Sequence, residues 1–136
     1  MKADTAARER KIKRILALQR QLHRLSQWRL GELQRQEDAI QGKQRDLIGA
    51  LNDDGRLQGL FVAAMAKRLS SLADEGARVA GLKKVQTEDV WAHARRVRQS
   101  ERLADVLSVA RRRDNEKKER EDLTERVAAR PDASFR

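Results

Sequence analysis

The stretch Asn52-Asp53-Asp54-Gly55 is the clearest interruption in the interior of this 136-residue chain. Asn and Asp form local side-chain hydrogen bonds that favour turns, and Gly adopts positive φ without steric cost. Helix-favouring Ala, Leu, Arg, Glu, Gln and Lys dominate the segments on both sides. The sequence therefore predicts an all-α fold: a long antiparallel two-helix coiled-coil hairpin with unequal arms, turned at this stretch.

One helical domain and a short tail account for the whole chain in this interpretation. The hairpin is expected to cover residues 4–129, with helix one at 4–51, the tip loop at 52–56 and helix two at 57–129. Residues 130–136 contain the one proline, Pro131, and are expected to form a disordered tail.

Apolar residues at 3-4 spacing predict the seam between the arms. In helix one they are Ile15, Leu18, Leu22, Leu25, Leu33, Ile40, Leu47 and Leu51. In helix two they are Phe61, Met65, Leu69, Leu72, Gly76, Val79, Gln86, Val90, Val97, Ala104 and Leu107. The eleven-residue step from Leu22 to Leu33 predicts a stutter in the supercoil.

Symmetry about the turn predicts the register of the two arms. Residue i should face residue ~109 − i if both arms are straight. Ile40 should then face Leu69, Leu33 should face Gly76, and helix two should have no partner within the chain beyond about residue 105.

The composition limits the possible functions. Charged residues make up 38% of the chain and aromatic residues 3%, and the formal net charge is +10. The absence of cysteine excludes disulfides and thiolate metal sites. No run of ~18 apolar residues is present, so we expect no transmembrane segment and a cytoplasmic location.

No residue pattern indicates catalysis or a cofactor. His23 and His93 are the only histidines, and neither has a second ligand at metal-binding spacing. The register places His93 level with about residue 16, and a two-helix hairpin offers almost no cleft that could perturb a carboxylate. We expect no enzymatic activity, no metal, no cofactor and no small-molecule substrate.

Positive charge gathers near both ends of the chain. The cluster in helix one contains Arg8, Arg10, Lys11, Lys13, Arg14, Arg20, Arg24 and Arg29, with Glu9 as the one acidic residue among them. An apolar patch of Leu103, Val106, Leu107 and Ala110, followed by Arg111, Arg112 and Arg113, should lie in the unpaired end of helix two. Such surfaces fit acidic partners, or they are simply solvated helix faces.

Nucleic-acid binding by counterion release is an alternative for the basic cluster. It is disfavoured because no zipper follows the basic region in basic-zipper order and no aromatic residues are interleaved for base stacking. A basic coiled-coil scaffold or a nucleic-acid-binding protein is kept as the second hypothesis.

A second apolar cluster, of Leu60, Phe61, Val62 and Met65, follows the turn. It either closes the tip by packing on Leu47, Ile48 and Leu51, or forms a docking face.

In these features the chain resembles the FliJ/YscO-like family of export stalk proteins in type III secretion. The resemblance covers the size, the cysteine-free basic composition, the two unequal helices and two segments. They are Gly59-Leu60-Phe61-Val62-Ala63-Ala64-Met65-Ala66-Lys67-Arg68-Leu69 after the turn and the charged segment 112–130.

The resemblance implies a non-enzymatic component of flagellar or virulence-type export, associated peripherally with the membrane apparatus. Its partners would be a hexameric export ATPase, a membrane export gate protein and export chaperones. The ATPase-facing residues would be Arg10, Lys13, Arg14, Arg20, Leu103, Leu107, Arg111, Arg112 and Arg113. The gate-facing residues would be Phe61, Met65 and Leu69, although the tyrosines that can mark the gate-binding face are missing here.

Overall fold

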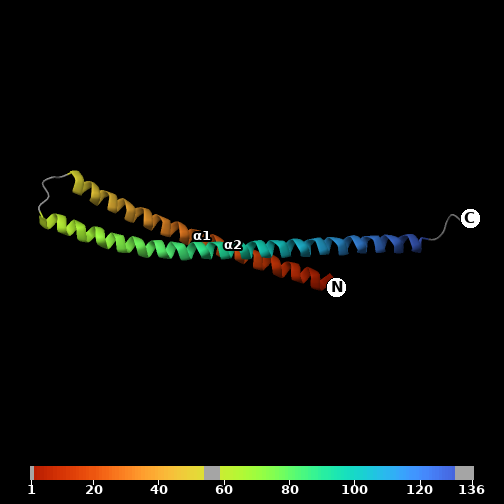
Figure 1. Cartoon of the computed structure of the whole chain (residues 1–136). Coiled ribbons are helices and arrows are strands. Elements are labelled where there is room, and N and C mark those ends of the chain that lie inside the picture. The colour runs from red at the N-terminus through yellow and green to blue at the C-terminus, as the bar shows by residue number, and fades with distance from the viewer. Residues whose placement is uncertain (1, 54–58, 131–136) are drawn as a thin grey trace, which may run out of the picture. The chain divides into compact units, whose positions relative to one another are not determined.

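The computed structural model describes residues 2–53 and 59–130, and these residues form two long helices. Helix α1 spans Lys2–Asp53 and helix α2 spans Gly59–Ala129 (Figure 1). No strand occurs in these two ranges, so the predicted all-α helical hairpin is confirmed. The α1 helix continues through Asn52 and Asp53, whereas the rest of the predicted turn and the tail at 131–136 lie outside the described residues.

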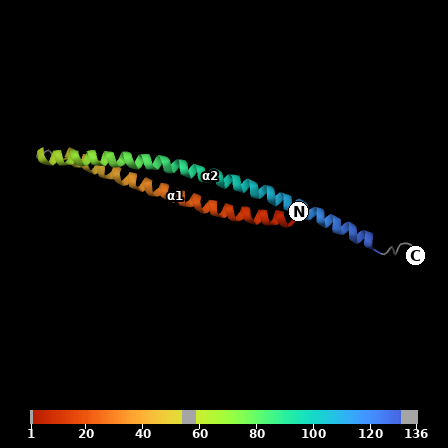
Figure 2. The ribbon, with the colours of Figure 1, turned by 90° about the horizontal axis from the view of Figure 1, so that it is seen from below.

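The chain divides into two compact units, each built from a segment of both helices. Unit 1 combines Met1–Gln19 with Arg96–Arg136, and unit 2 is Arg20–Arg95. In Figures 1 and 2, unit 2 contains the orange-to-yellow part of α1 and the yellow-green-to-teal part of α2. Both units pair the helices in antiparallel fashion, as the contacts below show.

The seam of α1 follows an unbroken 3-4 pattern. Its half-buried and buried positions are Thr5, Glu9, Ile12, Leu16, Gln19, His23, Ser26, Leu30, Leu33, Glu37, Ile40, Gln44, Leu47 and Leu51. The predicted stutter was wrong, because the true seam passes through polar residues that an apolar pattern leaves out. Leu18, Leu22 and Leu25, predicted to lie in the seam, are 56%, 40% and 43% exposed.

The seam of α2 has the same spacing and agrees better with the prediction. It comprises Met65, Leu69, Leu72, Gly76, Val79, Lys83, Gln86, Val90, His93, Val97, Ser100, Ala104 and Leu107. Of the predicted positions, only Phe61 is exposed. The spacing is that of a coiled coil, and interlocking side-chain packing remains a prediction.

The cluster of buried apolar residues lies in unit 2, and Leu16 is a further buried apolar residue in unit 1. Ile40, Leu72 and Val79 are buried together, and Leu33 and Leu47 pack against them at partly buried positions. Leu72 and Val79 are essentially inaccessible to solvent. Burial of such side chains is the main stabilising contribution to the pairing of the helices here.

The observed register differs from the predicted one. Facing residue numbers add up to between 112, for Ser26 with Gln86, and 120, for Glu37 with Lys83. A Cβ placed on Gly76 would lie 3.5 Å from Ile40 Cγ2, so Ile40 faces Gly76 and not Leu69. The prediction assumed that the chain folds symmetrically about residues 52–56, but these pairs have their midpoints at residues 56–60.

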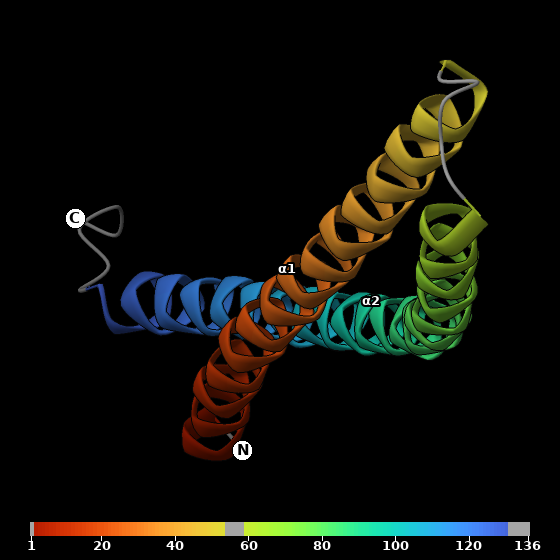
Figure 3. The same cartoon turned by 90° about the vertical axis from the view of Figure 1, so that its left-hand side faces the viewer.

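The later register also shortens the unpaired end of α2. Arg111 contacts Glu9, so the pairing of α2 continues past the predicted limit at about residue 105. Every residue from Arg111 to Arg130 is exposed. Figures 1 and 2 show this blue end of α2 continuing beyond the red start of α1. In Figure 3 the blue end of α2 and the red start of α1 again lie apart from each other.

Candidate functional site

The paired part of unit 1 is strongly basic. Residues 2–19 and 96–113 together contain twelve Lys or Arg and four Asp or Glu. One of the four acidic residues, Glu9, is 2% exposed and is neutralised by basic neighbours. The exposed charge of this unit is therefore positive, which favours acidic partners.

Glu9 connects α1 to α2 within this basic region. Its Oε2 atom lies 3.2 Å from Arg111 Nε, and its Oε1 atom lies 3.1 Å from Lys13 Nζ. The Lys13 contact is within ion-pair distance but is not a directed hydrogen bond, since Oε1 has no hydrogen-bond partner. A buried carboxylate needs such compensation, so Lys13 and Arg111 serve the fold as well as the surface.

A second polar contact in unit 1 lies three seam positions further along α1. Ser100 Oγ donates a hydrogen bond to Gln19 Oε1, and Ser100 is 8% exposed. This hydrogen bond and the Glu9–Arg111 contact join the two helices of unit 1, together with the buried apolar residue Leu16. Hydrogen-bonded seams contribute less to stability than apolar ones but fix the register.

The predicted ATPase-facing residues fall into two groups. Arg10, Arg14, Arg20, Leu103, Arg112 and Arg113 are exposed. Leu107 is half-buried in the seam, and Arg111 is 45% exposed with its guanidinium on Glu9. Lys13 is 59% exposed and also contacts Glu9.

The predicted gate-facing residues also differ in exposure. Phe61 is 61% exposed, whereas Met65 and Leu69 are half-buried seam residues. Val62 and Ile48 are exposed as well, so the expected packing of the post-turn cluster on Ile48 does not bury either residue. Phe61 and Val62 thus present an apolar surface at the start of α2.

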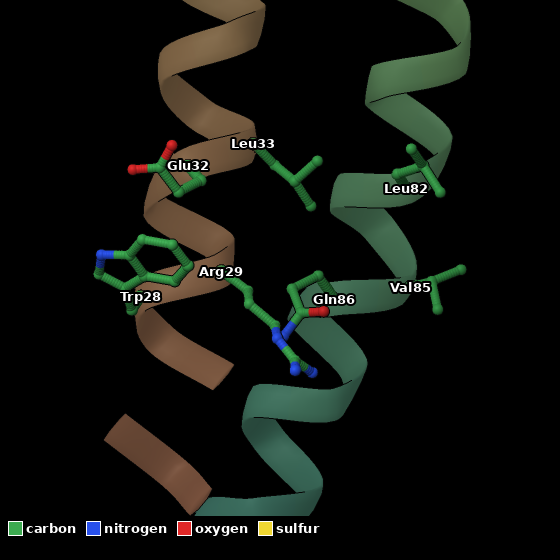
Figure 4. A pocket seen from close by; sticks show the side chains of 7 residues that line it. All are labelled: Trp28, Arg29, Glu32, Leu33, Leu82, Val85 and Gln86. Atoms are coloured by element: carbon green, nitrogen blue, oxygen red, sulfur yellow. The ribbon is translucent and has the colours of Figure 1, made fainter. Parts of the chain in front are cut away.

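An open groove in unit 2 was not expected from the sequence. It has a volume of about 310 Å³ and is lined by Trp28, Arg29, Glu32, Leu33, Leu82, Val85 and Gln86. Figure 4 shows Leu82 and Val85 on the α2 side, Trp28 and Glu32 on the α1 side, and Arg29 reaching from α1 toward α2. Trp28 and Val85 are 59% and 60% exposed.

Two neighbouring bonds fix the groove in place. Gln86 Nε2 donates a hydrogen bond of 3.0 Å to the backbone oxygen of Ser26, which ties α2 to α1 beside the groove. Nearer to the turn, Lys83 Nζ lies 3.2 Å from Glu37 Oε1 and makes a second contact between the two helices. The one sequence signal for the groove is the apolar stripe of Leu18, Leu22 and Leu25, which the 3-4 spacing assigns to the seam.

The two histidines occupy facing seam positions. His23 and His93 are half-buried in unit 2, and their numbers fit the register of the neighbouring pairs. The prediction that His93 lies level with about residue 16 was therefore wrong. Among the described residues, no three or more His, Cys, Asp or Glu side chains group closely enough to hold a metal ion.

Neither described helix contains a stretch long and apolar enough to cross a membrane. Comparisons with family models, curated proteins and solved structures found no match to this chain.

Proposed function

We propose that this chain is a non-enzymatic helical stalk of a type III protein export apparatus, which couples a hexameric ATPase to a membrane export gate. The observation that carries the proposal is the basic paired part of unit 1, with twelve basic and four acidic residues. A positively charged pair of helices suits the acidic lumen of a ring. The resemblance to the FliJ/YscO-like family supplies the identity of the ring.

The exposed end of α2 supports the same proposal. Residues 111–130 are all exposed, so this segment has a surface free for an intermolecular contact along its whole length. Arg112 and Arg113 mark its start, and alternating charges fill the rest. Long-range attraction between the basic pair of helices and an acidic lumen would guide insertion.

The gate would be contacted by the other unit. Phe61 and Val62 are exposed apolar residues at the start of α2, and aromatic residues are enriched in the centres of protein interfaces. Met65 and Leu69 would contribute less, because they already lie in the seam. Export chaperones are further candidate partners on the family resemblance alone.

The proposal is tested by the ATPase rate of a purified hexameric export ATPase with and without this chain. The unmodified chain should stimulate the rate, and Arg112→Glu plus Arg113→Glu should weaken stimulation by about tenfold, because two attractive contacts become repulsive. Arg111 is left intact, since its reversal would also break the Glu9 contact. The matched control is the exposed adjacent pair Lys67→Glu plus Arg68→Glu in unit 2, which should stimulate normally.

The second candidate is a basic scaffold or nucleic-acid-binding protein, favoured by the same positive charge. It predicts binding to duplex DNA at physiological salt, with affinity that falls steeply as salt rises. Such binding without any effect on the export ATPase would reject the stalk proposal.

A further inference from the structure

The groove of unit 2 continues as an apolar strip on α1. Arg29 and Glu32 line the groove. Leu22 lies seven residues before Arg29, and Leu25 lies seven residues before Glu32. Residues seven apart lie on the same side of a helix in a 3.5-residue pattern, so both leucines extend the groove wall. They are 40% and 43% exposed, although large apolar residues of such a stripe are normally covered.

The residue types in the groove are those that dominate binding energy in interfaces. Trp and Arg are over-represented among interface residues whose truncation is most costly, and Trp28 and Arg29 lie side by side here. Leu82 and Val85 form an apolar wall on the α2 side and are 46% and 60% exposed. An exposed apolar strip that crosses both helices is a feature of partner-binding sites.

The charges around the groove indicate the chemistry of its occupant. Among the described residues, Glu32 is already paired with Arg35, whereas Arg29 makes no ion pair. Arg29 is therefore the charged residue of the α1 wall that is left to pair with an occupant. A partner that approaches this wall gains from negative charge and loses from positive charge.

A second copy of the chain is a poor occupant. In a two-fold symmetric dimer the same patch meets itself, and the groove lining offers Arg29 of the other copy no carboxylate except Glu32, which is already paired with Arg35. Arg29 would then be covered without an acidic partner, which disfavours that interface. The occupant must therefore combine apolar side chains at helical spacing with acidic ones.

We propose that the groove between Trp28 and Val85 binds an acidic amphipathic helix of a partner protein. The partner inserts its leucine-type side chains along Leu22, Leu25 and Leu82, and a carboxylate pairs with Arg29. This surface lies wholly in unit 2 and shares no residue with the proposed ATPase and gate contacts, so the proposal does not rest on the stalk function.

Fluorescence of Trp28 provides the test. The full chain with Trp91→Phe retains Trp28 as its single tryptophan and is titrated with two synthetic helical peptides. Both peptides carry Leu at i, i+3 and i+4 spacing. The Glu peptide has glutamate at the other positions, and the Lys peptide has lysine there. The Glu peptide should shift Trp28 emission to shorter wavelength and saturate, and the Lys peptide should bind at least about tenfold more weakly.

Two substitutions distinguish the groove from general attraction to a basic protein. Arg29→Glu should reverse the preference between the peptides. Val85→Ser should weaken the binding of the Glu peptide by about three- to tenfold, because an apolar contact is lost. Val127→Ser, at a valine 63% exposed and outside the groove, should leave the affinity unchanged.

Three results would overturn the proposal. They are equal Trp28 shifts with both peptides, an unchanged preference in Arg29→Glu, and self-association of the chain that buries Trp28 and excludes the Glu peptide. All the substituted residues are exposed, so circular dichroism should show the same helix content in each variant.

Discussion

Glu9 and Arg111 form an ion pair of 3.2 Å that joins α1 near its start to α2 near the end of its paired part. Glu9 is 2% exposed, so its carboxylate has left water and depends on Arg111 and Lys13 for compensation. The contact lies near the end of the paired part of α2, because every α2 residue from Arg111 onward is exposed.

Arg111→Met should therefore destabilise the pairing in unit 1 by about 1–3 kcal/mol, since it leaves a buried carboxylate with one basic partner. Faster hydrogen exchange of the amides in residues 5–16 should report the loss. Arg112→Met is the matched control and should leave exchange unchanged. Glu9→Leu combined with Arg111→Met should recover most of the stability, because the buried charge is then gone.

Leu72 and Leu82 allow a second test, of the core position in unit 2. Leu72 is fully buried with Ile40 and Val79, whereas Leu82 is 46% exposed in the groove wall. Leu72→Ala should lower the free energy of unfolding by about 2–5 kcal/mol, and Leu82→Ala by less than about 1 kcal/mol. Urea unfolding followed by circular dichroism measures both. Similar losses in the two variants would contradict the observed core.

The fold class was predictable because turn chemistry and helix-favouring composition agree along the chain. The seam of α2 was predictable as well, since apolar residues occupy most of its positions. The first half of α1 misled the prediction because Glu9, Gln19 and Ser26 occupy its seam, while Leu18 and Leu22 lie outside it. Apolar periodicity identifies a stripe, and cannot by itself decide whether the neighbouring helix or another protein covers that stripe.

The basic character of unit 1 was also predictable, because charge counts need only the sequence. The groove was not, since it depends on which α2 residues lie opposite Arg29 and Glu32. A register error of about two helical turns places other α2 residues opposite Arg29 and Glu32. The sequence alone does not fix this register. The Glu9–Arg111 pair was missed for the same reason.

Gly76 offers a direct test of the register. A Cβ at this position would meet Ile40 Cγ2 at an ordinary contact distance of 3.5 Å, and a Cβ at Gly81 would meet nothing within 4 Å. Gly76→Ala and Gly81→Ala should each stabilise the protein by up to about 1 kcal/mol, because alanine favours the helix. Gly76→Leu should instead destabilise it by about 1–3 kcal/mol through overpacking against Ile40, whereas Gly81→Leu should not. Equal tolerance of leucine at the two positions in thermal unfolding would contradict the pairing of Ile40 with Gly76.

His23 and His93 test whether the polar seam limits the stability of unit 2. Both are half-buried at facing seam positions, where leucine is the usual residue of a helix pair. His23→Leu combined with His93→Leu should raise the free energy of unfolding by about 1–2 kcal/mol, since apolar contact replaces two partly desolvated imidazoles. Each single substitution should yield less than half of this gain, because the new leucine would still face a histidine. Gln21→Leu, at an exposed position of α1, is the control and should leave the thermal transition unchanged. If the double variant melts no higher than the control, the two histidines do not face each other across the seam.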